Sequence, residues 1–410
     1  MSYDVLIVGG SVAGAACSVL LRQMGLRVRV MEKVASPSAY KKLCTHFIQP
    51  SAVPVLSRLN MDYLTSAENS VRTRATFITP VGIIDPEGFY GDDCTRSALN
   101  LERSVLDPAL RREAQALGVE FGYAERVTEV QRLPEGWRLT VEKQEKTFSV
   151  EGRFLIAADG RTSVLARLLG NPTQRHENQR ATYFAYCSGI NAPADNRSLF
   201  AHHQNGMAFL YPLARGRTLL SAYIAKETAQ QWQQQDLKTM LINFFASVPS
   251  MPAMDDAIFE TPVMGYQDYP NLIRQPVCQN VAFIGDAAQS LDPMSGVGCS
   301  FALQTAAMLS QAVEASLHHG VIDEQSALQT WQRLFNDYFP PHARGIIADA
   351  LIAKENQGQK SIFQTIVNDE GLQRQYRDLT GRLISPAAFQ NAFLLSKVRQ
   401  NAAARKAQEA

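Results

Sequence analysis

The stretch "YDVLIVGGSVAGAACSVLLRQMGLRVRVMEK", Tyr3 to Lys33, decides the fold class. It opens with the apolar, β-branched run "VLIV", which is typical of a strand buried on both faces. A segment of helical spacing follows and ends near Gly25, where a glycine is suited to end a helix. A second strand then runs to Glu32. This order predicts a βαβ unit of a doubly wound α/β fold.

The turn between the first strand and the helix nearly matches a dinucleotide-binding fingerprint. Gly9 permits the sharp turn, and Gly14 lets the helix lie close to the sheet. Ser11 replaces the middle glycine. Its Cβ crowds the expected pyrophosphate position, but its hydroxyl can donate to a phosphate at the helix N-terminus. Glu32 follows Gly14 by 18 residues, where an acid hydrogen-bonds a ribose hydroxyl. We expect an intact nucleotide site; the alternative is a doubly wound domain without a ligand.

The composition argues against several function classes. The chain has 410 residues, with 40 lysines and arginines against 39 aspartates and glutamates. This balance indicates neither nucleic acid nor an anionic membrane surface as a partner, and the length favours more than one lobe. The six cysteines show no CxxC pair and no metal-ligand spacing, so we expect reduced thiols and no metal site. We also expect no signal peptide, no membrane span and a cytoplasmic location.

Two later segments carry further strand ends. In "RFLIAADGRTSVLARLLG", Arg153 to Gly170, an apolar strand runs into Asp159 and a glycine. In "NVAFIGDAAQSLDPMSGVGCSFALQTAAMLSQAV", Asn280 to Val313, another strand delivers Asp286, and a long amphipathic helix starts near Gly298. Ligands bind at the carboxyl ends of parallel strands, where an acid can hold a ribose or ribityl hydroxyl. The unsatisfied N–H groups at the start of the helix suit a ligand group that becomes anionic.

Four motifs in fixed order resemble a known family. "VGGSVAG", "RSVLDPALRREAQALGVEF", "AADGRTS" and "FIGDAAQSLDPMSGVG" occur in the order found in FAD-dependent monooxygenases of the aromatic-hydroxylase type. Geranylgeranyl reductases and flavin-dependent halogenases belong to the same superfamily. The resemblance covers roughly residues 1–170 and 275–330. It implies FAD as the cofactor and NAD(P)H as the electron donor.

The resemblance also implies a role for each matching position. This chain has counterparts of seven FAD-binding features of the family. They are the pyrophosphate turn, the adenosine ribose acid, the arginine of the "RxxLD" helix, the strand whose backbone meets adenine, the "DG" acid, the ribityl acid of the "GD" motif and the loop beside the isoalloxazine. The chain departs from the pattern at Ser11 and at Gln289, where many relatives carry histidine. The cofactor-binding residues so implied are Gly9, Ser11, Val12, Ala13, Gly14, Glu32, Lys33, Arg103, Val127, Asp159, Gly160, Asp286, Pro293, Gly296, Val297 and Gly298.

The segments between these motifs predict a second lobe. "ATYFAYCSGI", "SLFAHHQNGMAFLYPLA" and "RTLLSAYIAKE" are rich in aromatic and β-branched residues, which favours antiparallel strands. From Pro340 onward the composition is mostly helical. We therefore predict a Rossmann-like FAD-binding lobe with a mostly parallel, doubly wound sheet, a substrate-binding lobe with an antiparallel sheet, and a helical C-terminal region. The expected boundaries are 1–70, 95–170 and 275–330 for the FAD lobe, 71–94 and 171–274 for the substrate lobe, and 331–410 for the C-terminal region.

Four residues are candidates for direct catalytic roles. The sequence Lys42-Leu43-Cys44 resembles a lysine-x-cysteine site of geranylgeranyl reductases, although a threonine and His46 replace the glycines that follow there. Lys42 or His46 is expected to face the flavin or the substrate; the alternative is a packing loop with a buried thiol.

The other two candidates belong to the expected substrate lobe. His202 and His203 precede a strand that should line the pocket, and adjacent strand residues point to opposite faces, so at most one can serve. His203 is the candidate we keep, with a structural histidine as its alternative. Tyr211 could bind a substrate or simply pack in the core. His318 and His319 are expected to end a helix and interact favourably with its dipole.

The resemblance implies hydroxylation of an aromatic or electron-rich small molecule through a flavin C4a-hydroperoxide, formed from reduced flavin and O₂, in secondary metabolism. A reductase of isoprenoid double bonds is the first alternative. A halogenase ranks below it, because none of Trp137, Trp232 and Trp331 lies in a "WxWxIP" motif. An enzyme that modifies protein side chains and a non-enzymatic flavin-binding protein complete the alternatives. A homodimer is compatible with the sequence, which does not identify the substrate or the pyridine nucleotide.

Overall fold

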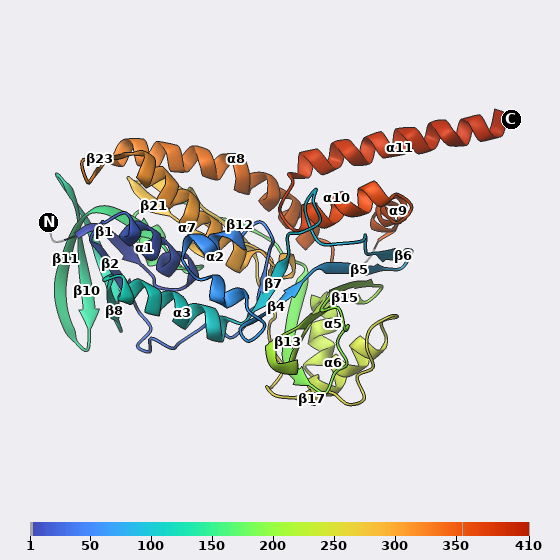
Figure 1. Ribbon diagram of the computed structural model, residues 1–410. Coiled ribbons are helices and arrows are strands. Elements are labelled where there is room, and N and C mark those ends of the chain that lie inside the picture. Colours follow the sequence, from blue (N-terminus) through green and yellow to red (C-terminus); the bar gives the residue numbers. More distant parts are fainter. Residues whose placement is uncertain (1–2, 355, 410) are drawn as a thin grey trace.

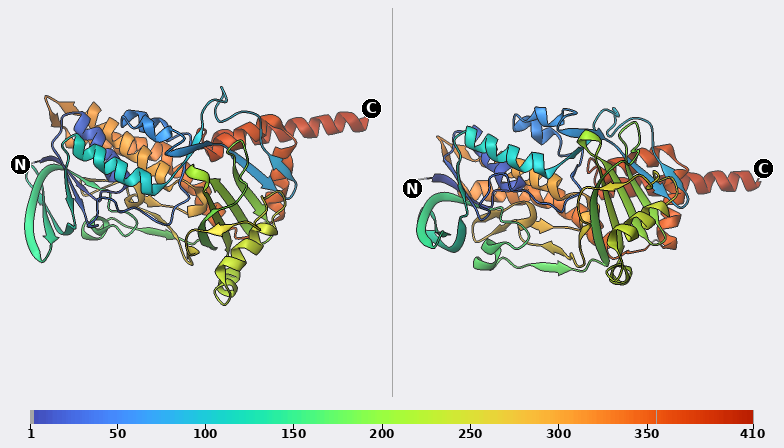
Figure 2. Two further views of the ribbon diagram at one scale, coloured as in Figure 1. Left: turned by 60° about the horizontal axis from the view of Figure 1, so that its bottom comes forward. Right: turned by 90° about the horizontal axis from the view of Figure 1, so that it is seen from below.

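The computed structural model describes residues 3–354 and 356–409, and from residue 401 onward it describes the backbone only. A central sheet lies at the N-terminal end of the molecule, and a second sheet with its own helices lies beside it (Figures 1 and 2). The C-terminal helices run over the second sheet, and the last one extends away from the body. The helices are α1 (Val12–Gln23), α2 (Pro54–Arg58), α3 (Arg103–Ala116), α4 (Val164–Leu168), α5 (Lys226–Trp232), α6 (Leu237–Ala246), α7 (Gly298–Ala315), α8 (Glu324–Ala350), α9 (Gln357–Val367), α10 (Glu370–Thr380) and α11 (Pro386–Glu409).

The first sheet has the predicted mostly parallel order. Its path is β20-β21-β11-β1-β2-β8; β10 pairs antiparallel with the first half of β11, and β9 pairs antiparallel with β10. Four neighbouring pairs are parallel: β1 with β2, β1 with β11, β2 with β8 and β11 with β21. The predicted α/β fold class is thus confirmed. The strands are β1 (Tyr3–Val8), β2 (Val28–Glu32), β8 (Glu120–Tyr123), β9 (Arg126–Leu133), β10 (Gly136–Lys143), β11 (Lys146–Ala157), β20 (Val277–Cys278) and β21 (Val281–Phe283).

Small residues bring α1 close to this sheet. A Cβ at Gly14 would lie 1.9 Å from the carbonyl oxygen of Gly9, which no real contact allows. Gly9 itself has a φ of +99°, a conformation that residues with a Cβ rarely adopt. The two glycines therefore fix the distance between helix and strand, and the opening of α1 lies directly against the end of β1.

The second sheet is mostly antiparallel, as expected. Its path is β17-β13-β16-β15-β14-β5-β6; only β14 and β5 pair in parallel, and β18 pairs with β13. His202 and His203 are the last two residues of β14 and, as expected, precede another strand, β15. This sheet consists of β5 (Ala75–Thr79), β6 (Gly82–Ile84), β13 (Arg180–Ser188), β14 (Ser198–His203), β15 (Gly206–Pro212), β16 (Thr218–Ala225), β17 (Ile258–Phe259) and β18 (Met264–Tyr266).

The two faces of the second sheet have different cores. Because alternate side chains point to opposite faces, one face carries aliphatic residues and alanines, such as Leu210 and Ile224, that pack on α5 and α6. The other face carries aromatic residues that pack toward α9 and α10, such as Phe200 and Phe209. This aromatic face forms part of the site described below.

Short strands complete the fold. β3 (Phe47–Ile48), β7 (Ala98–Leu101) and β4 (Ser70–Thr73) form one small sheet, and β12 (Gln174–His176), β19 (Asn271–Ile273) and β22 (Gln289–Ser290) form another. β23 (Leu317–His318) pairs with β24 (Val321–Ile322). The expectation that His318 and His319 end a helix is wrong, since α7 ends at Ala315 and His318 lies in β23.

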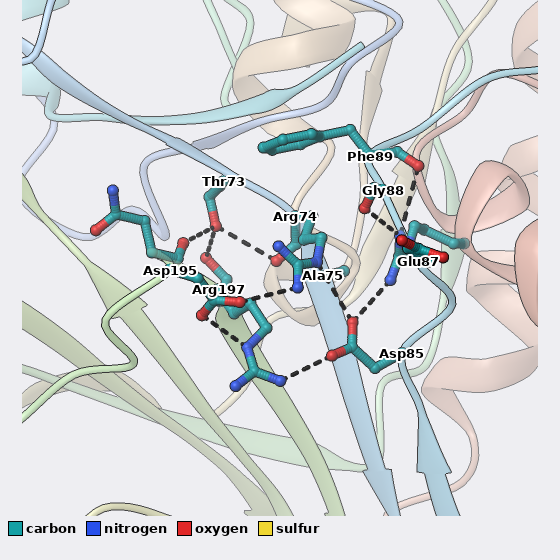
Figure 3. Close-up of polar contacts among 12 residues, drawn as sticks. Thr73, Arg74, Ala75, Asp85, Glu87, Gly88, Phe89, Asp195 and Arg197 are labelled. Atoms are coloured by element: carbon teal, nitrogen blue, oxygen red, sulfur yellow. Dashed lines mark hydrogen bonds and ion pairs between the residues drawn. The ribbon is translucent and has the colours of Figure 1, made fainter. Parts of the chain in front are cut away.

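An arginine network ties the C-terminal region to the second sheet. Asp85 accepts hydrogen bonds from Arg197 (2.7 Å) and Arg74 (3.4 Å), and Arg74 also reaches Asp195 (2.9 Å) (Figure 3). From α10, Arg377 donates to the same Asp85 carboxylate at 2.8 Å. The network therefore holds α10 against the loop that follows β6.

Within residues 3–354 and 356–409, no helix combines the length and the apolar character needed to cross a membrane. The same residues contain no cluster of histidine, cysteine and carboxylate side chains suited to a metal ion.

Candidate functional site

A cavity of about 1160 Å³ lies at the carboxyl ends of the parallel strands. Its walls include the ends of β1, β2 and β11, the segment after β21 and the first residue of α7. This is where a doubly wound sheet binds its ligand. Of the predicted cofactor residues, Gly9, Ser11, Val12, Ala13, Glu32, Lys33, Arg103, Val127, Asp159, Gly160, Asp286, Pro293, Gly296 and Gly298 line this cavity.

Two of the predicted cofactor residues, Gly14 and Val297, are absent from the cavity wall. Gly14 is buried between α1 and β1, where its role is the close approach described above. Val297 is buried at the N-terminus of α7. Both positions support the wall without facing a ligand.

The Glu32 carboxylate is fixed at one end of the cavity. It accepts hydrogen bonds from the backbone N–H of Gly10 (2.6 Å) and of Val34 (2.9 Å), one on each oxygen. Each carboxylate oxygen has two lone pairs, so both can accept a further bond from a ribose hydroxyl. The turn and the acid are thus held in one rigid unit.

Arg103 explains how Ser11 fits its position. The guanidinium donates to the Ser11 hydroxyl oxygen at 2.9 Å and to the Asp107 carboxylate at 2.8 Å. Because the serine oxygen accepts from Arg103, the hydroxyl proton remains free to donate to a phosphate. This contact places Arg103 at the N-terminus of α1, where the unpaired backbone N–H groups already favour an anion.

One carboxylate oxygen of Asp159 receives no hydrogen bond from the described residues. Its Oδ2 accepts from the backbone N–H of Leu165 at 3.0 Å, while its Oδ1 is buried and has no partner among the described residues. Burial raises the pKa of this carboxyl group. A buried acceptor without a partner costs free energy, and a hydroxyl or amide of a bound cofactor would satisfy it.

At the other end of the cavity lie Asp286 and the start of α7. Lys41 Nζ lies 3.7 Å from the Asp286 carboxylate, and Lys41 lines the cavity whereas its neighbour Lys42 does not. A Cβ at Gly298 would meet no atom within 4 Å, so the N-terminus of α7 has room for a planar ring system beside it. The donor set, the unmet acceptor and this open helix end fit FAD.

Two cysteines that sequence reasoning left as ordinary thiols meet in this cavity. The sulfur atoms of Cys44 and Cys299 lie 3.6 Å apart, and both residues are free thiols in the cavity wall. The hydrogen bond from Cys299 lowers the pKa of Cys44 well below its usual value, and the same contact raises that of Cys299. Only the fold brings these residues together, because they are separated by 255 positions.

His46 occupies a structural position. Its Nδ1 accepts the backbone N–H of Arg103 at 3.0 Å, and its Nε2 contacts the hydroxyl of Tyr186. The residue is buried with a φ of +59°. It lines neither the cavity described above nor a second cavity, which is described below. Its ring holds the start of α3, and thereby places Arg103.

The two remaining catalytic candidates, His203 and Tyr211, lie in different environments. His203 lies at the end of β14 near Phe244 and lines neither cavity. His202 points the other way, toward Phe363, and lines a second cavity. Tyr211 also lines that second cavity, and its buried hydroxyl has no partner among the described residues.

The second cavity, of about 440 Å³, lies between the aromatic face of the second sheet and the C-terminal helices. Phe47, Asp292 and Gly296 line both cavities, so the two meet at these residues. Sequence reasoning missed most of its polar residues because they come from the C-terminal region, where no motif marked them. The aromatic lining residues are Phe47, Phe77, Tyr90, Phe200, Phe209, Tyr211, Phe363 and Tyr376, and the polar ones include Gln49, His202, His342, Asp349 and Arg382.

A large cavity at the strand ends that meets a smaller aromatic one has room for a nucleotide cofactor and a small molecule side by side. The family comparison agrees: residues 2–326 match the model described as "FAD binding domain", and the chain belongs to this family. It is therefore an FAD-dependent flavoenzyme of an oxidoreductase family.

Curated relatives of more than one activity are similar to the chain. A flavin-dependent halogenase, armH1, from Armillaria mellea is 24% identical in an alignment of 350 residues that covers 77% of this chain and 65% of the halogenase. The chain thus spans just under two thirds of that relative. A digeranylgeranylglycerophospholipid reductase from Methanococcus vannielii is 21% identical over 77% of this chain and 78% of the reductase.

Solved structures share the fold over nearly the whole chain. The flavin-dependent brominase Bmp2 superposes with a TM-score of 0.75 at 19% identity, over 97% of this chain and 99% of the brominase. The p-nitrophenol 4-monooxygenase PnpA from Pseudomonas putida gives a TM-score of 0.73 at 17% identity, over 94% and 98%. At this level of identity the likeness concerns the fold alone.

Proposed function

We propose that the protein is an FAD-dependent monooxygenase that hydroxylates an aromatic or electron-rich small molecule, with NAD(P)H as reductant and O₂ as co-substrate, in secondary metabolism. The observation that carries the proposal is the aromatic cavity of about 440 Å³ that meets the nucleotide cavity at Phe47, Asp292 and Gly296. A substrate held there would lie next to the loop Pro293–Ser295, beside the expected position of the flavin ring.

Each end of the FAD would have its own set of protein groups. Glu32 would bind the adenosine ribose, Ser11 and the start of α1 the pyrophosphate, and Asp286 the ribityl chain. The N-terminus of α7 at Gly298 would stabilise negative charge on the pyrimidine edge of the reduced ring. The bound cofactor supplies the activation of oxygen.

The protein would contribute position and exclusion of water. The aromatic wall is already packed: the rings of Phe200 and Phe209 lie 4.7 Å apart, and those of Phe200 and Tyr211 lie 5.4 Å apart. A flat substrate can pack against this wall and displace water from the reacting carbon. The proposal requires no dedicated acid or base, which agrees with the structural role of His46.

Two observations each favour a different alternative function. Cys44 lines the nucleotide cavity in a segment that resembles the lysine-x-cysteine site of geranylgeranyl reductases, which favours reduction of an isoprenoid double bond. The halogenase armH1 at 24% identity favours halogenation as a further candidate. The same flavin lobe serves all three reactions.

One experiment separates the three. The FAD-loaded protein is given NADPH, O₂, chloride or bromide and a panel of phenols, indoles, quinolines and isoprenoid alcohols, and products are identified by mass. We expect a product with one added oxygen atom that requires both NADPH and O₂. A product with two added hydrogen atoms formed without O₂, or a halogenated product that requires halide, would replace the proposal by the corresponding alternative.

A further inference from the structure

The second cavity is lined by one cation that forms no ion pair with the side chains the structure describes. Arg382 is the only lysine or arginine among its lining residues. Within the side chains that the structure describes, no carboxylate forms an ion pair with it. The acids of the same wall already have a partner: Arg180 binds Asp292 at 2.5 Å and Asp349 at 2.9 Å. The two acids share the single Arg180, so Arg382 balances the formal charge of the wall but faces the cavity without a direct ion-pair partner among the described side chains.

The guanidinium of Arg382 is also poor in hydrogen bonds. Among the described residues its buried Nε has no hydrogen-bond partner, and its Nη2 reaches only the carbonyl oxygen of Ser295, at a long 3.4 Å. A guanidinium has five N–H donors, and a buried donor without an acceptor costs free energy. Burial lowers the pKa of Arg382 to about 10, and the nearby Asp349 carboxylate offsets this shift only in part.

The backbone holds Arg382 in place before any ligand arrives. Its φ is +62°, in the left-handed region, and its carbonyl oxygen accepts a hydrogen bond from the Tyr338 hydroxyl at 3.0 Å. Its N–H donates to the carbonyl of Leu379 at 3.1 Å. The residue that carries the charge is therefore positioned by α8 and by the end of α10.

The position of Arg382 places an anion close to the junction of the two cavities. Ser295, its hydrogen-bond partner, directly precedes Gly296, which lines both cavities. A carboxylate on Arg382 would hold the attached ring at this junction. Away from the junction the wall is aromatic, so the rest of the ligand meets Phe77, Phe200 and Phe363.

Other polar groups of the wall suit neutral contacts. Burial lowers the pKa of both His202 and His342 to about 4, so both imidazoles are uncharged at neutral pH. The Nδ1 of His342 and the hydroxyl of Tyr211 are buried without partners among the described residues. They can hydrogen-bond a hydroxyl, amino or carbonyl substituent, whereas only Arg382 can neutralise a charge.

We infer that the substrate of this cavity is an aromatic carboxylic acid, bound as its anion with the carboxylate on Arg382 and the ring among the aromatic side chains. The inference deepens the proposed function, on which its use of the term substrate rests. The planar guanidinium fits a carboxylate with two parallel hydrogen bonds, which gives both affinity and orientation.

The test is a binding measurement on the FAD-loaded protein in its oxidised form. The flavin absorbance or fluorescence is titrated with matched pairs: benzoate and benzamide, 2-naphthoate and 2-naphthamide, indole-2-carboxylate and indole-2-carboxamide. We expect the acid of at least one pair to bind about tenfold or more tightly than its amide, because a charge-assisted hydrogen bond contributes that much. Equal or tighter binding of the amide in every pair would overturn the inference.

Variants assign the preference to Arg382. Arg382→Met should weaken the acid about 10- to 100-fold and leave the amide nearly unchanged, and Arg382→Lys should keep part of the preference. The matched control is Arg344→Gln, which also removes one positive charge from the region, since Arg344 is exposed on α8 and lines neither cavity. Acid binding that survives in Arg382→Met, or falls equally in Arg344→Gln, would contradict the assignment. Should Arg382→Met fail to fold, the acid-to-amide ratio of Arg382→Lys against that of the unmodified protein decides the question.

Binding to oxidised flavin needs neither NADPH nor O₂. A protein that prefers the acids but forms no hydroxylated product would therefore contradict the proposed function while leaving the anion site intact. Hydroxylation of neutral aromatics without any preference for acids would contradict the anion site alone.

Discussion

The two cavities of this protein are built in different ways. The nucleotide cavity is formed mostly by backbone turns and short side chains at strand ends, each within a compact motif. The aromatic cavity is formed by large side chains from β5, β14, β15, α8, α9 and α10, which lie far apart in the chain. The nucleotide cavity therefore depends mainly on local backbone geometry, whereas the aromatic cavity depends on how distant elements pack together.

The largest effect is expected at the backbone contact under the nucleotide cavity. Gly14→Val would place a Cβ 1.9 Å from the Gly9 carbonyl oxygen and force α1 away from β1. We expect a loss of about 3 kcal/mol or more in the free energy of unfolding, together with loss of bound FAD. Urea denaturation and the ratio of flavin to protein absorbance measure both. The control is Gly345→Ala in α8, where a Cβ meets nothing within 4 Å and should be tolerated. An FAD-loaded, stable Gly14→Val protein would refute the close-approach argument.

The aromatic cavity should show a loss of stability without loss of cofactor. Phe200 is 8% exposed and packs on Phe77, Phe209 and Tyr211. We expect Phe200→Ala to lower the free energy of unfolding by about 3 kcal/mol while FAD content stays near that of the unmodified protein. Phe148→Ala, at a 37% exposed position, should cost much less. Flavin loss in Phe200→Ala as severe as in Gly14→Val would show that the two cavities do not behave as separate units.

Asp286 tests the cofactor cavity without disturbing the packing. Its carboxylate lies at the cavity wall beside Lys41. Asp286→Ala should weaken FAD binding about 10- to 100-fold, because a charged hydrogen-bond acceptor is lost. Isothermal titration of the apoprotein with FAD gives the dissociation constant, and Asp255→Ala at an exposed position serves as control. Unchanged affinity in Asp286→Ala would remove this residue from the cofactor site.

The smallest effect concerns pH and the histidines of the aromatic cavity. Burial lowers the pKa of His342 to about 4 in the folded protein, against about 6.5 in an unfolded chain. The unfolded state therefore binds more protons between these values, so stability is full above about pH 6.5 and is lost as pH falls toward 4. Thermal melts from pH 7.5 to 5 should show a fall in Tm that is smaller in His342→Gln. An identical pH dependence in both proteins would mean that His342 contributes nothing to it.

Sequence reasoning was most successful where function depends on a local motif. The βαβ unit around Gly9 and Gly14, the strand ends at Asp159 and Asp286 and the helix starting at Gly298 all follow from short stretches whose geometry is fixed by neighbouring residues. The mostly parallel sheet and the antiparallel second sheet were predicted from the same kind of pattern.

The catalytic candidates were harder to place, because they depend on contacts across the fold. Lys42 was chosen where Lys41 lines the cavity, since a one-residue shift in an irregular loop leaves no periodic signal. His203 was kept where His202 faces the aromatic cavity, since alternation along a strand indicates two faces but not which one is inner. Arg382 received no role because the C-terminal helices carry no motif, and its lack of a direct ion pair becomes visible only in the folded structure.

We propose that oxygen from O₂ is transferred to an aromatic molecule held in the second cavity. The most direct measurement is a single turnover with isotopically labelled O₂, using FAD-loaded protein, NADPH and an aromatic acid that binds. The account predicts one labelled oxygen atom in the product, and loss of that product in Arg382→Met. A product without the label, formed by addition of hydrogen or of halogen, would contradict it.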